Sequence, residues 1–322
     1  MITLFAMVGG PHLVGAAAFV VQQVGGDLPV APLRVEEVGR LVGLSVAGAW
    51  LLGLILSRPR GETGGWPWRQ VSVFVGVFAV IVADEHGEFS PDRVPTQIAG
   101  HLTELILWIW LCVEVAARCG VTFHRLDITR PAWLVRKRTK AERAKAAQGE
   151  MVFFAYAAAI CASMFLAERL RLLPGPVLDG DQAAAAGVPD LGPHLAHAVW
   201  SATVEEVLAT ALVVAVLTAM RRPRWEALTV VALMRGLPHI YVGLWPALAF
   251  MSLGVAAGWL YLRYRRVIPL VLAHAAYNVV NIAVGLPPLL LVCALMLVGA
   301  GWSWVEARRA PADALSPGEP SE

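Results

Sequence analysis

The chain has 322 residues, of which 57% are hydrophobic and 16% are charged, and its mean hydropathy is +0.63. A soluble domain carries about 25% charged residues, so this composition excludes an ordinary globular surface in water. The net charge of +2 gives no sign of a nucleic-acid partner, and we expect none. Apolar blocks near the length of about 20 residues that crosses a hydrocarbon layer instead predict membrane helices. The expected fold class is all-α, a polytopic bundle of transmembrane helices.

About ten apolar segments follow one another along the chain. The third, VSVFVGVFAVIVA, is short for a membrane span, and the others are close to the expected length. An even number of spans places both termini on the same side of the bilayer. The segments cover roughly residues 3–23, 38–57, 70–84, 98–117, 150–167, 196–219, 226–243, 246–262, 267–285 and 288–305.

Basic residues are unevenly shared between the loops. With the N-terminus inside, most Lys and Arg fall in inside loops, and the three long outside loops hold few of them. By the positive-inside rule, both termini are then cytoplasmic. We expect a multi-pass protein of the cell membrane, the bacterial cytoplasmic membrane. The richest inside loops are 58–69, 118–148, 221–224 and 263–266.

These features divide the chain into four parts. Residues 1–117 form N-terminal transmembrane helices, and residues 118–149 form a basic cytoplasmic loop. Residues 150–305 form a second helical unit, the predicted core. The tail, residues 306–322, is polar and rich in Pro, which is typical of a disordered segment.

Ionisable side chains inside membrane segments are functional candidates, because a charge in the bilayer is costly. The sixth segment carries the adjacent carboxylates Glu205 and Glu206, and the seventh carries Arg235 and His239. Arg235 and His239 are four residues apart and share a helix face. Pro238 predicts a kink beside the histidine.

The ninth segment carries His274, Asn278 and Asn281 at spacings that place them on one stripe. Interhelical hydrogen bonding is the alternative reading of the asparagines, and of Asn281 most of all. Residue counts from the outer boundary place His274, Glu205 and His239 at comparable depths. The three segments therefore predict one polar cluster.

A second polar set lies in the N-terminal half. His101 and Glu104 are three residues apart, a spacing that can bind a metal ion. No matching pair lies opposite them, and the acidic residues of 84–88 are typical of a solvated loop. His194 and His197 precede the sixth segment, where they either line the mouth of the site or begin the helix.

Three motifs resemble the signature of the CPBP (CAAX-protease and bacteriocin-processing) family, and in particular its type II CAAX prenyl endopeptidase-like members of the bacterial subset. The family pattern is Glu-Glu-x-x-x-Arg, then Phe-x-x-x-His, then His-x-x-x-Asn/Asp on successive helices. Here the motifs begin at Glu205, at Arg235 and at His274, in the same order and at the same spacing. The resemblance covers about residues 150–305.

The resemblance implies an intramembrane endopeptidase that hydrolyses a peptide bond of a membrane protein or peptide. Glu205 with His239 would activate a water molecule, and Glu206 would be the supporting carboxylate. His274 and Asn278 would hold the oxyanion of the intermediate. The resemblance implies no cofactor, and zinc bound through Glu205, His239 and His274 is the alternative.

The chain departs from the family pattern at two positions. Thr210 stands where the arginine of the first motif is expected, and Arg235 stands where the phenylalanine of the second is expected. We interpret Arg235 as the source of the missing positive charge. An enclosed guanidinium needs an acidic partner, so a contact with Glu206 is predicted, with Glu205 as the second choice. Thr210 is expected to be too distant or too neutral to matter.

Two other functions are consistent with the same residues. One is a catalytically inactive membrane scaffold or immunity protein of this fold. The other is a small proton-coupled transporter, which the lack of an inverted repeat disfavours. A cleavage assay of Glu205→Gln separates the protease from the scaffold.

Overall fold

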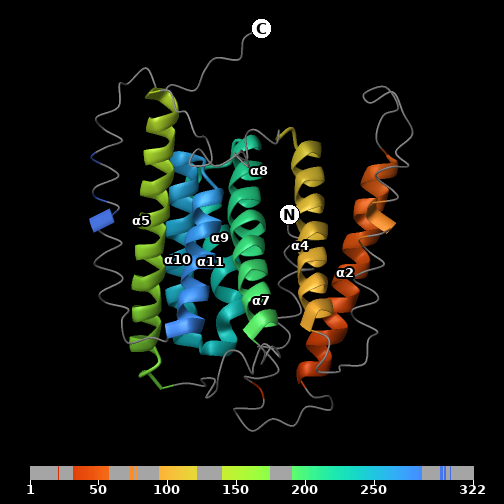
Figure 1. Ribbon diagram of the computed structural model, residues 1–322, viewed down its shortest axis with the longest axis horizontal. Helices are drawn as coiled ribbons and strands as arrows, with labels where there is room; N and C mark the ends of the chain where they lie inside the picture. Colours follow the sequence, from red (N-terminus) through yellow and green to blue (C-terminus); the bar gives the residue numbers. More distant parts are fainter. Residues whose placement is uncertain are drawn as a thin grey trace.

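Long helices lie side by side in the described part of the chain (Figure 1). The computed structural model describes residues 21, 32–57, 73–75, 77, 94–121, 140–174, 191–284, 298–299, 301 and 305. The predicted all-α class is confirmed. Most residues of the first, third and tenth predicted segments lie outside the described residues. The described elements are α2 (Pro32–Leu56), α4 (Val94–Arg118), α5 (Lys140–Leu170), α7 (Leu191–Val204), η4 (Glu205–Leu212), α8 (Val213–Ala219), α9 (Arg224–Gly236), η5 (Leu237–Val242), α10 (Leu244–Tyr264) and α11 (Ile268–Val284).

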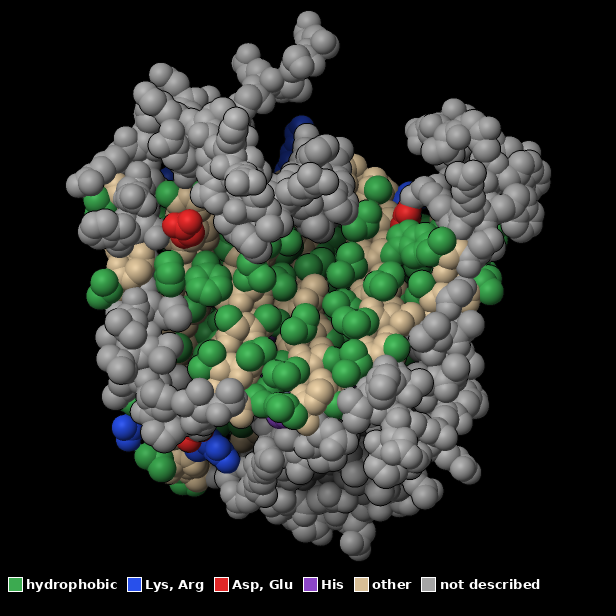
Figure 2. Space-filling view, viewed as in Figure 1, with side chains coloured by type: hydrophobic (Ala, Val, Ile, Leu, Met, Phe, Trp, Pro, Cys, Tyr) green, Lys and Arg blue, Asp and Glu red, His purple; other side chains and the backbone are tan. Residues whose placement is uncertain are grey.

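Four continuous helices among the described residues are long and apolar enough to cross a membrane. They are Ile98–Arg118, Ala146–Leu170, Leu191–Ala219 and Leu244–Tyr264. Large apolar side chains stand exposed along α10, including Leu248 and Trp259. Figure 2 shows hydrophobic side chains over the middle of the described surface, with acidic and basic ones toward its upper and lower edges. This distribution fits a bundle surrounded by lipid.

Two helices depart from their predicted extents. α5 begins at Lys140, inside residues predicted as loop. The sequence there, KAERAKAAQGE, consists mainly of strong helix formers, so the helix continues beyond its apolar stretch. The seventh predicted segment does not form one kinked helix, because α9 ends at Gly236 and the 3-10 helix η5 follows. Pro238 accounts for the end of α9, because it has no backbone N–H to donate to the hydrogen bond that an α-helix requires.

The sixth predicted segment is a continuous helix of 29 residues, Leu191–Ala219. Its central part is η4, a π-helix of eight residues that begins at Glu205. Glu205 is the middle residue of the whole helix. π-Turns within α-helices are rare and occur frequently at functional sites. The carboxylate pair therefore lies midway along an apolar helix, at a change in its winding.

Helix α10 packs closely against α9 through a seam of small residues. A Cβ atom at Gly254 would lie 2.8 Å from the Cα of Ala232 and 2.9 Å from the Cβ of Arg235. At Gly258 it would lie 3.0 Å from the side chain of Leu228. Glycines four residues apart allow membrane helices to approach at backbone distance. The seam thus fixes the part of α9 from which Arg235 projects.

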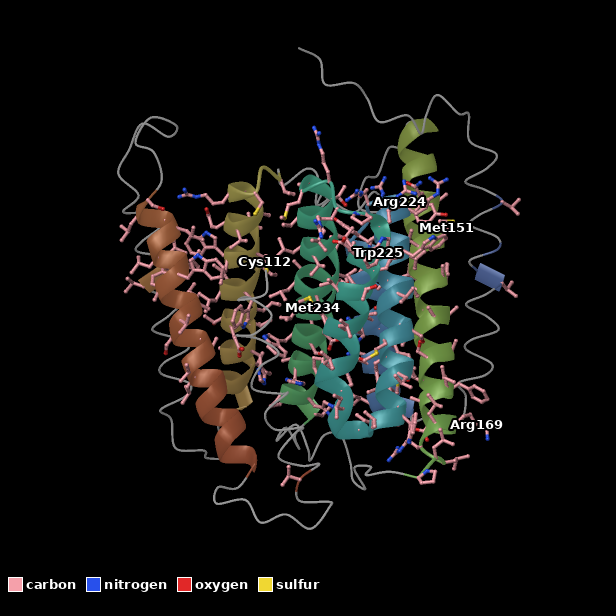
Figure 3. The ribbon with its side chains drawn as sticks, turned by 180° about the vertical axis from the view of Figure 1, so that it is seen from behind. Cys112, Met151, Arg169, Arg224, Trp225 and Met234 are labelled. Atoms are coloured by element: carbon pink, nitrogen blue, oxygen red, sulfur yellow. The ribbon has the colours of Figure 1, made fainter. Side chains whose placement is uncertain are left out.

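Arginine residues mark both ends of the bundle. In Figure 3, Arg224 lies at the same end as Met151, whereas Arg169 lies at the opposite end. α8, α9 and α10 are joined by short connections, so they alternate in direction. Arg263 at the end of α10 therefore shares the end of Arg224.

Candidate active site

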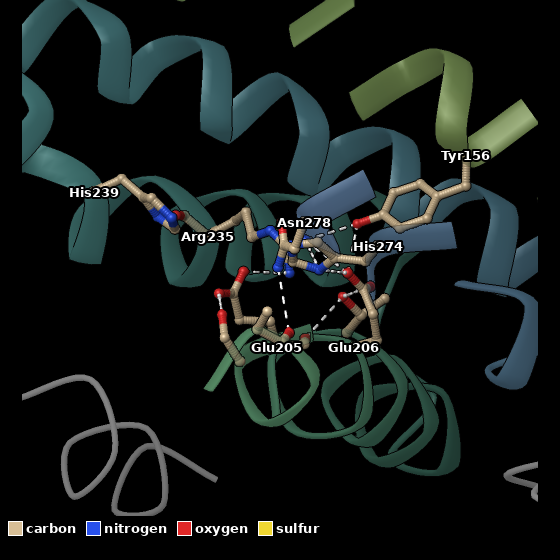
Figure 4. Close-up of polar contacts among 10 residues, drawn as sticks. Tyr156, Glu205, Glu206, Arg235, His239, His274 and Asn278 are labelled. Carbon is tan, nitrogen blue, oxygen red and sulfur yellow. Dashed lines mark hydrogen bonds and ion pairs between the residues drawn. The ribbon is translucent and has the colours of Figure 1, made fainter. Parts of the chain in front are cut away.

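Polar side chains from different helices meet in one cluster (Figure 4). Four elements contribute to it, with two glutamates from η4 and single side chains from α5, α9 and α11. The name "buried cluster" is used below for these five side chains. They are Tyr156, Glu205, Glu206, Arg235 and His274.

Glu206 is the central acceptor of the buried cluster. Its side chain is 0% exposed, and its Oε1 atom lies 2.6 Å from Nη2 of Arg235. The hydroxyl of Tyr156 donates to the same oxygen at 2.6 Å, and Nδ1 of His274 lies 3.0 Å from it. A carboxylate that is shielded from water needs such donors around it to remain charged. The negative charge of Glu206 is therefore compensated by side chains from three helices.

The number of available hydrogens fixes the direction of these bonds. Nη2 of Arg235 carries two hydrogens, and its acceptors are Oε1 of Glu206 and the Tyr156 oxygen, at 2.6 and 2.7 Å. Nη2 also lies 3.2 Å from Nδ1 of His274, but no hydrogen is left for that contact. His274 then carries its own hydrogen on Nδ1 and donates it to Glu206. Its other ring nitrogen, Nε2, takes no part in these bonds.

The predicted contact of Arg235 with the glutamates is confirmed. Nη1 lies 2.9 Å from Oε2 of Glu205, so the guanidinium, 2% exposed, bridges both carboxylates. This second contact lacks the alignment of a hydrogen bond, and Nε and Nη1 have no hydrogen-bond partner within the described part of the chain. Thr210 is not too distant, because its hydroxyl lies 3.3 Å from Oε2 of Glu206 and 3.3 Å from the backbone oxygen of Glu205. That it is too neutral to matter stays a prediction.

The two carboxylates differ in their access to the surroundings. The side chain of Glu205 is 24% exposed, against 0% for Glu206. Ser201, one turn earlier on α7, donates to Oε1 of Glu205 at 2.8 Å. Glu205 is thus the carboxylate that an incoming molecule can reach, and Glu206 is enclosed.

His239 lies one turn beyond Arg235, on η5. Its Nδ1 atom is 2.7 Å from the backbone oxygen of Arg235, and its ring stacks on Phe250 with centroids 4.1 Å apart. A carbonyl oxygen only accepts hydrogen bonds, so Nδ1 carries the hydrogen. In a neutral His239 the lone pair is therefore on Nε2.

The asparagines of α11 take different places. Nδ2 of Asn278 donates to the backbone oxygen of Ala198 at 3.3 Å, which ties α11 to α7 just before η4. Asn281 is half-buried and stands outside the contacts of the buried cluster among the described residues.

Two contributors to the site were missed in the sequence. Tyr156 lies in an apolar segment without a charged neighbour in the membrane, and no pattern marks it. Ser201 carries a weak signal, since it is four residues before Glu205 and shares its face.

Residues of the second polar set contact other side chains. His101 packs edge-on against His197, with ring centroids 5.4 Å apart. Oε1 of Glu104 accepts a hydrogen bond from Trp108 at 3.3 Å. Within the described residues, no group of three or more His, Cys, Asp or Glu side chains is placed to hold a metal ion.

Comparison with known families identifies part of the chain. Residues 189–280 match the family model described as type II CAAX prenyl endopeptidase Rce1-like. Over these residues the match agrees with the resemblance seen in the three motifs, but it does not test the bacterial subset, and it covers less than the predicted range 150–305. It contains the whole buried cluster except Tyr156. Comparisons with curated proteins and with solved structures found no match.

Proposed function

We propose that this Rce1-like membrane protein is an intramembrane endopeptidase that cleaves a membrane-associated protein or peptide. The family match supports a protease of the CAAX type at the level of the family. The observation that carries the proposal is the unequal carboxylate pair, in which Glu206 is enclosed and Glu205 is 24% exposed. In such a pair, the enclosed carboxylate can serve as a fixed charge while the accessible carboxylate takes part in the reaction.

In the proposed reaction, Glu205 and His239 activate a water molecule. The water oxygen attacks the carbonyl carbon of the peptide bond while its proton passes to Glu205 or to Nε2 of His239. The resulting tetrahedral intermediate carries its negative charge on the former carbonyl oxygen. The carbon–nitrogen bond then breaks, and the held proton moves to the leaving amine.

The charge on the oxyanion requires donors near Glu205. We assign this role to His274 and Asn278, as the family resemblance implies. Nδ1 of His274 donates to Glu206, so a donor at Nε2 requires a second hydrogen on the ring, as in the imidazolium form. Nη1 of Arg235 is a further donor, since it faces Glu205 without an aligned hydrogen bond.

The experiment is cleavage of fluorogenic peptides by the purified full chain in lipid nanodiscs. The panel holds a prenylated peptide with a CAAX-type end, its unprenylated form and an apolar membrane-spanning peptide. Glu205→Gln should lower kcat by about 10³-fold or more. His239→Ala should do much the same, and the double variant should be little worse. Glu104→Gln is the matched control, because Glu104 is also a buried membrane glutamate but lies outside the cluster.

The same assay tests for a metal ion. The proposed roles of Glu205 and His239 need none, so exhaustive chelation should leave kcat unchanged. Loss of activity on chelation, restored by zinc, would replace this mechanism with a metal-dependent one. Retained cleavage in Glu205→Gln would remove the glutamate mechanism.

One observation favours a second function. Arg235 lies 2.9 Å from Glu205, which neutralises the carboxylate proposed as base. The same contact suits a catalytically inactive membrane scaffold or immunity protein. Wild-type protein that cleaves no peptide of the panel would support this second function.

A further inference from the structure

Helix α5 contributes to the buried cluster although it lies outside the residues that match the family. The match begins at residue 189, and α5 ends at Leu170. α5 packs against α10 and α11, which places Tyr156 beside the cluster. The site is therefore completed by a helix that no motif includes.

Tyr156 is 0% exposed, and its hydroxyl contacts two charged groups. It donates to Oε1 of Glu206 at 2.6 Å and accepts from Nη2 of Arg235 at 2.7 Å. A buried tyrosine hydroxyl normally finds one partner. Here it has an anion and a cation, so the phenol links the two members of the ion pair.

We propose that Tyr156 is a positioning residue that holds Arg235 between the carboxylates and sets the hydrogen on His274. This role rests on the proposed function, in which Glu205 activates the water. With Nη2 fixed by Tyr156 and Glu206, the guanidinium directs Nη1 toward Glu205. In the family pattern, an arginine at the position of Thr210 supports Glu206. Here Tyr156 and Arg235 share that role.

The effect on His274 follows from the hydrogen count. The Tyr156 oxygen accepts the second hydrogen of Nη2, which leaves Nδ1 of His274 free to donate to Glu206. Without the hydroxyl, that hydrogen turns to its remaining neighbour, Nδ1 of His274, which lies 3.2 Å from Nη2. The ring must then carry its hydrogen on Nε2. Tyr156→Phe is therefore expected to exchange the two tautomers of His274.

The test is nitrogen-15 NMR of the histidines in the full chain, in nanodiscs, with His274 assigned by substitution. Wild type should show His274 protonated at Nδ1, and Tyr156→Phe should show it protonated at Nε2. Tyr261→Phe is the matched control, because Tyr261 is also 0% exposed but lies on α10 outside the cluster. It should leave the His274 signals unchanged. On any peptide that wild type cleaves, Tyr156→Phe should lower kcat by about tenfold to 100-fold with unchanged KM.

Each outcome decides the proposal. His274 protonated at Nδ1 in Tyr156→Phe would overturn it, and so would an exchanged tautomer with unchanged kcat. A wild type that cleaves nothing defeats the proposed function, while the NMR experiment still decides the role of Tyr156. If Tyr156→Phe fails to fold, fluorine NMR of the chain carrying 3-fluorotyrosine at its five tyrosines replaces it. Glu206→Gln must then shift the Tyr156 signal and leave that of Tyr261, and an unmoved Tyr156 signal would overturn the contact.

Discussion

Arg235 compensates two carboxylates at once, and this sets the charge of the site. A guanidinium with 2% exposure is stable in a membrane bundle only when anions surround it. Thr210 offers Glu206 a hydroxyl at 3.3 Å but no charge. The cation therefore comes from α9 rather than from the turn that follows the glutamates.

Replacement of Arg235 tests this origin of the charge. Arg235→Phe should destabilise the protein by about 3–5 kcal/mol and impair cleavage, because Glu206 is left enclosed and unpaired. Adding Thr210→Arg should recover part of both losses, since position 210 already faces Oε2 of Glu206. Thermal unfolding in detergent and the peptide assay measure the two effects.

Arg222→Gln is the control for that experiment. Arg222 pairs with Glu226 at 2.7 Å, but its side chain is 52% exposed. Exposed pairs contribute about 0–1 kcal/mol, so this variant should unfold close to wild type. An Arg235→Phe protein as stable and active as the control would contradict the assigned role.

At the scale of single residues, the contacts of the charged side chains could be predicted and those of the hydroxyls could not. Arg235 and Glu206 were paired from the sequence because a charge in the bilayer demands an opposite one. The uncharged hydroxyls of Tyr156 and Thr210 do not require an opposite charge nearby. A hydroxyl is common in apolar segments, and its partner depends on how α5 and η4 pack.

The seam between α9 and α10 positions Arg235 at the scale of helices. Gly254 lies against the backbone of Ala232, so there is no room for a methyl group unless the helices separate. The same helix face carries Gly258 one turn later. Close packing along this seam therefore determines how far the guanidinium reaches toward η4.

Substitution of Gly254 tests the seam. Gly254→Ala should destabilise the protein by about 1–3 kcal/mol through overpacking, and it should lower cleavage by moving Arg235. Gly53→Ala on α2 is the matched control, because a Cβ there meets nothing within 4 Å. That variant should be neutral or more stable by up to about 1 kcal/mol. Equal unfolding temperatures for the two variants would contradict the seam.

Helix positions followed from the sequence, and changes in helix type did not. Apolar blocks located α4, α10 and α11 to within a few residues of their observed ends. The same blocks cannot distinguish an α-turn from the π-turns of η4, since both bury a continuous apolar surface. The 3-10 helix η5 was anticipated in part, because Pro238 marked an interruption but not its form.

Across the whole molecule, charge distribution predicts orientation. The structure places Arg224 and Arg169 at opposite ends of the bundle (Figure 3). Cytoplasmic termini and a cytoplasmic Arg224 end stay predictions that follow from the positive-inside rule.

Cys119 offers a native probe of that orientation. It is exposed next to the end of α4, whereas Cys112 and Cys161 are buried. A membrane-impermeant maleimide should label Cys119 in inverted membrane vesicles and not in intact cells. Cys119→Ser should lose this labelling. Labelling of Cys119 from outside intact cells would reverse the topology.

The turn between α8 and α9 has a consequence for the biogenesis of the protein. The helix Leu191–Ala219 leaves the ribosome with two carboxylates at its midpoint and no cation of its own to offset them. Arg235 follows on the next helix, beyond a connection of residues 220–223. We therefore expect the two helices to enter the bilayer together as a hairpin, with the ion pair formed during insertion. Tyr156 is synthesised earlier and is already available when that hairpin arrives.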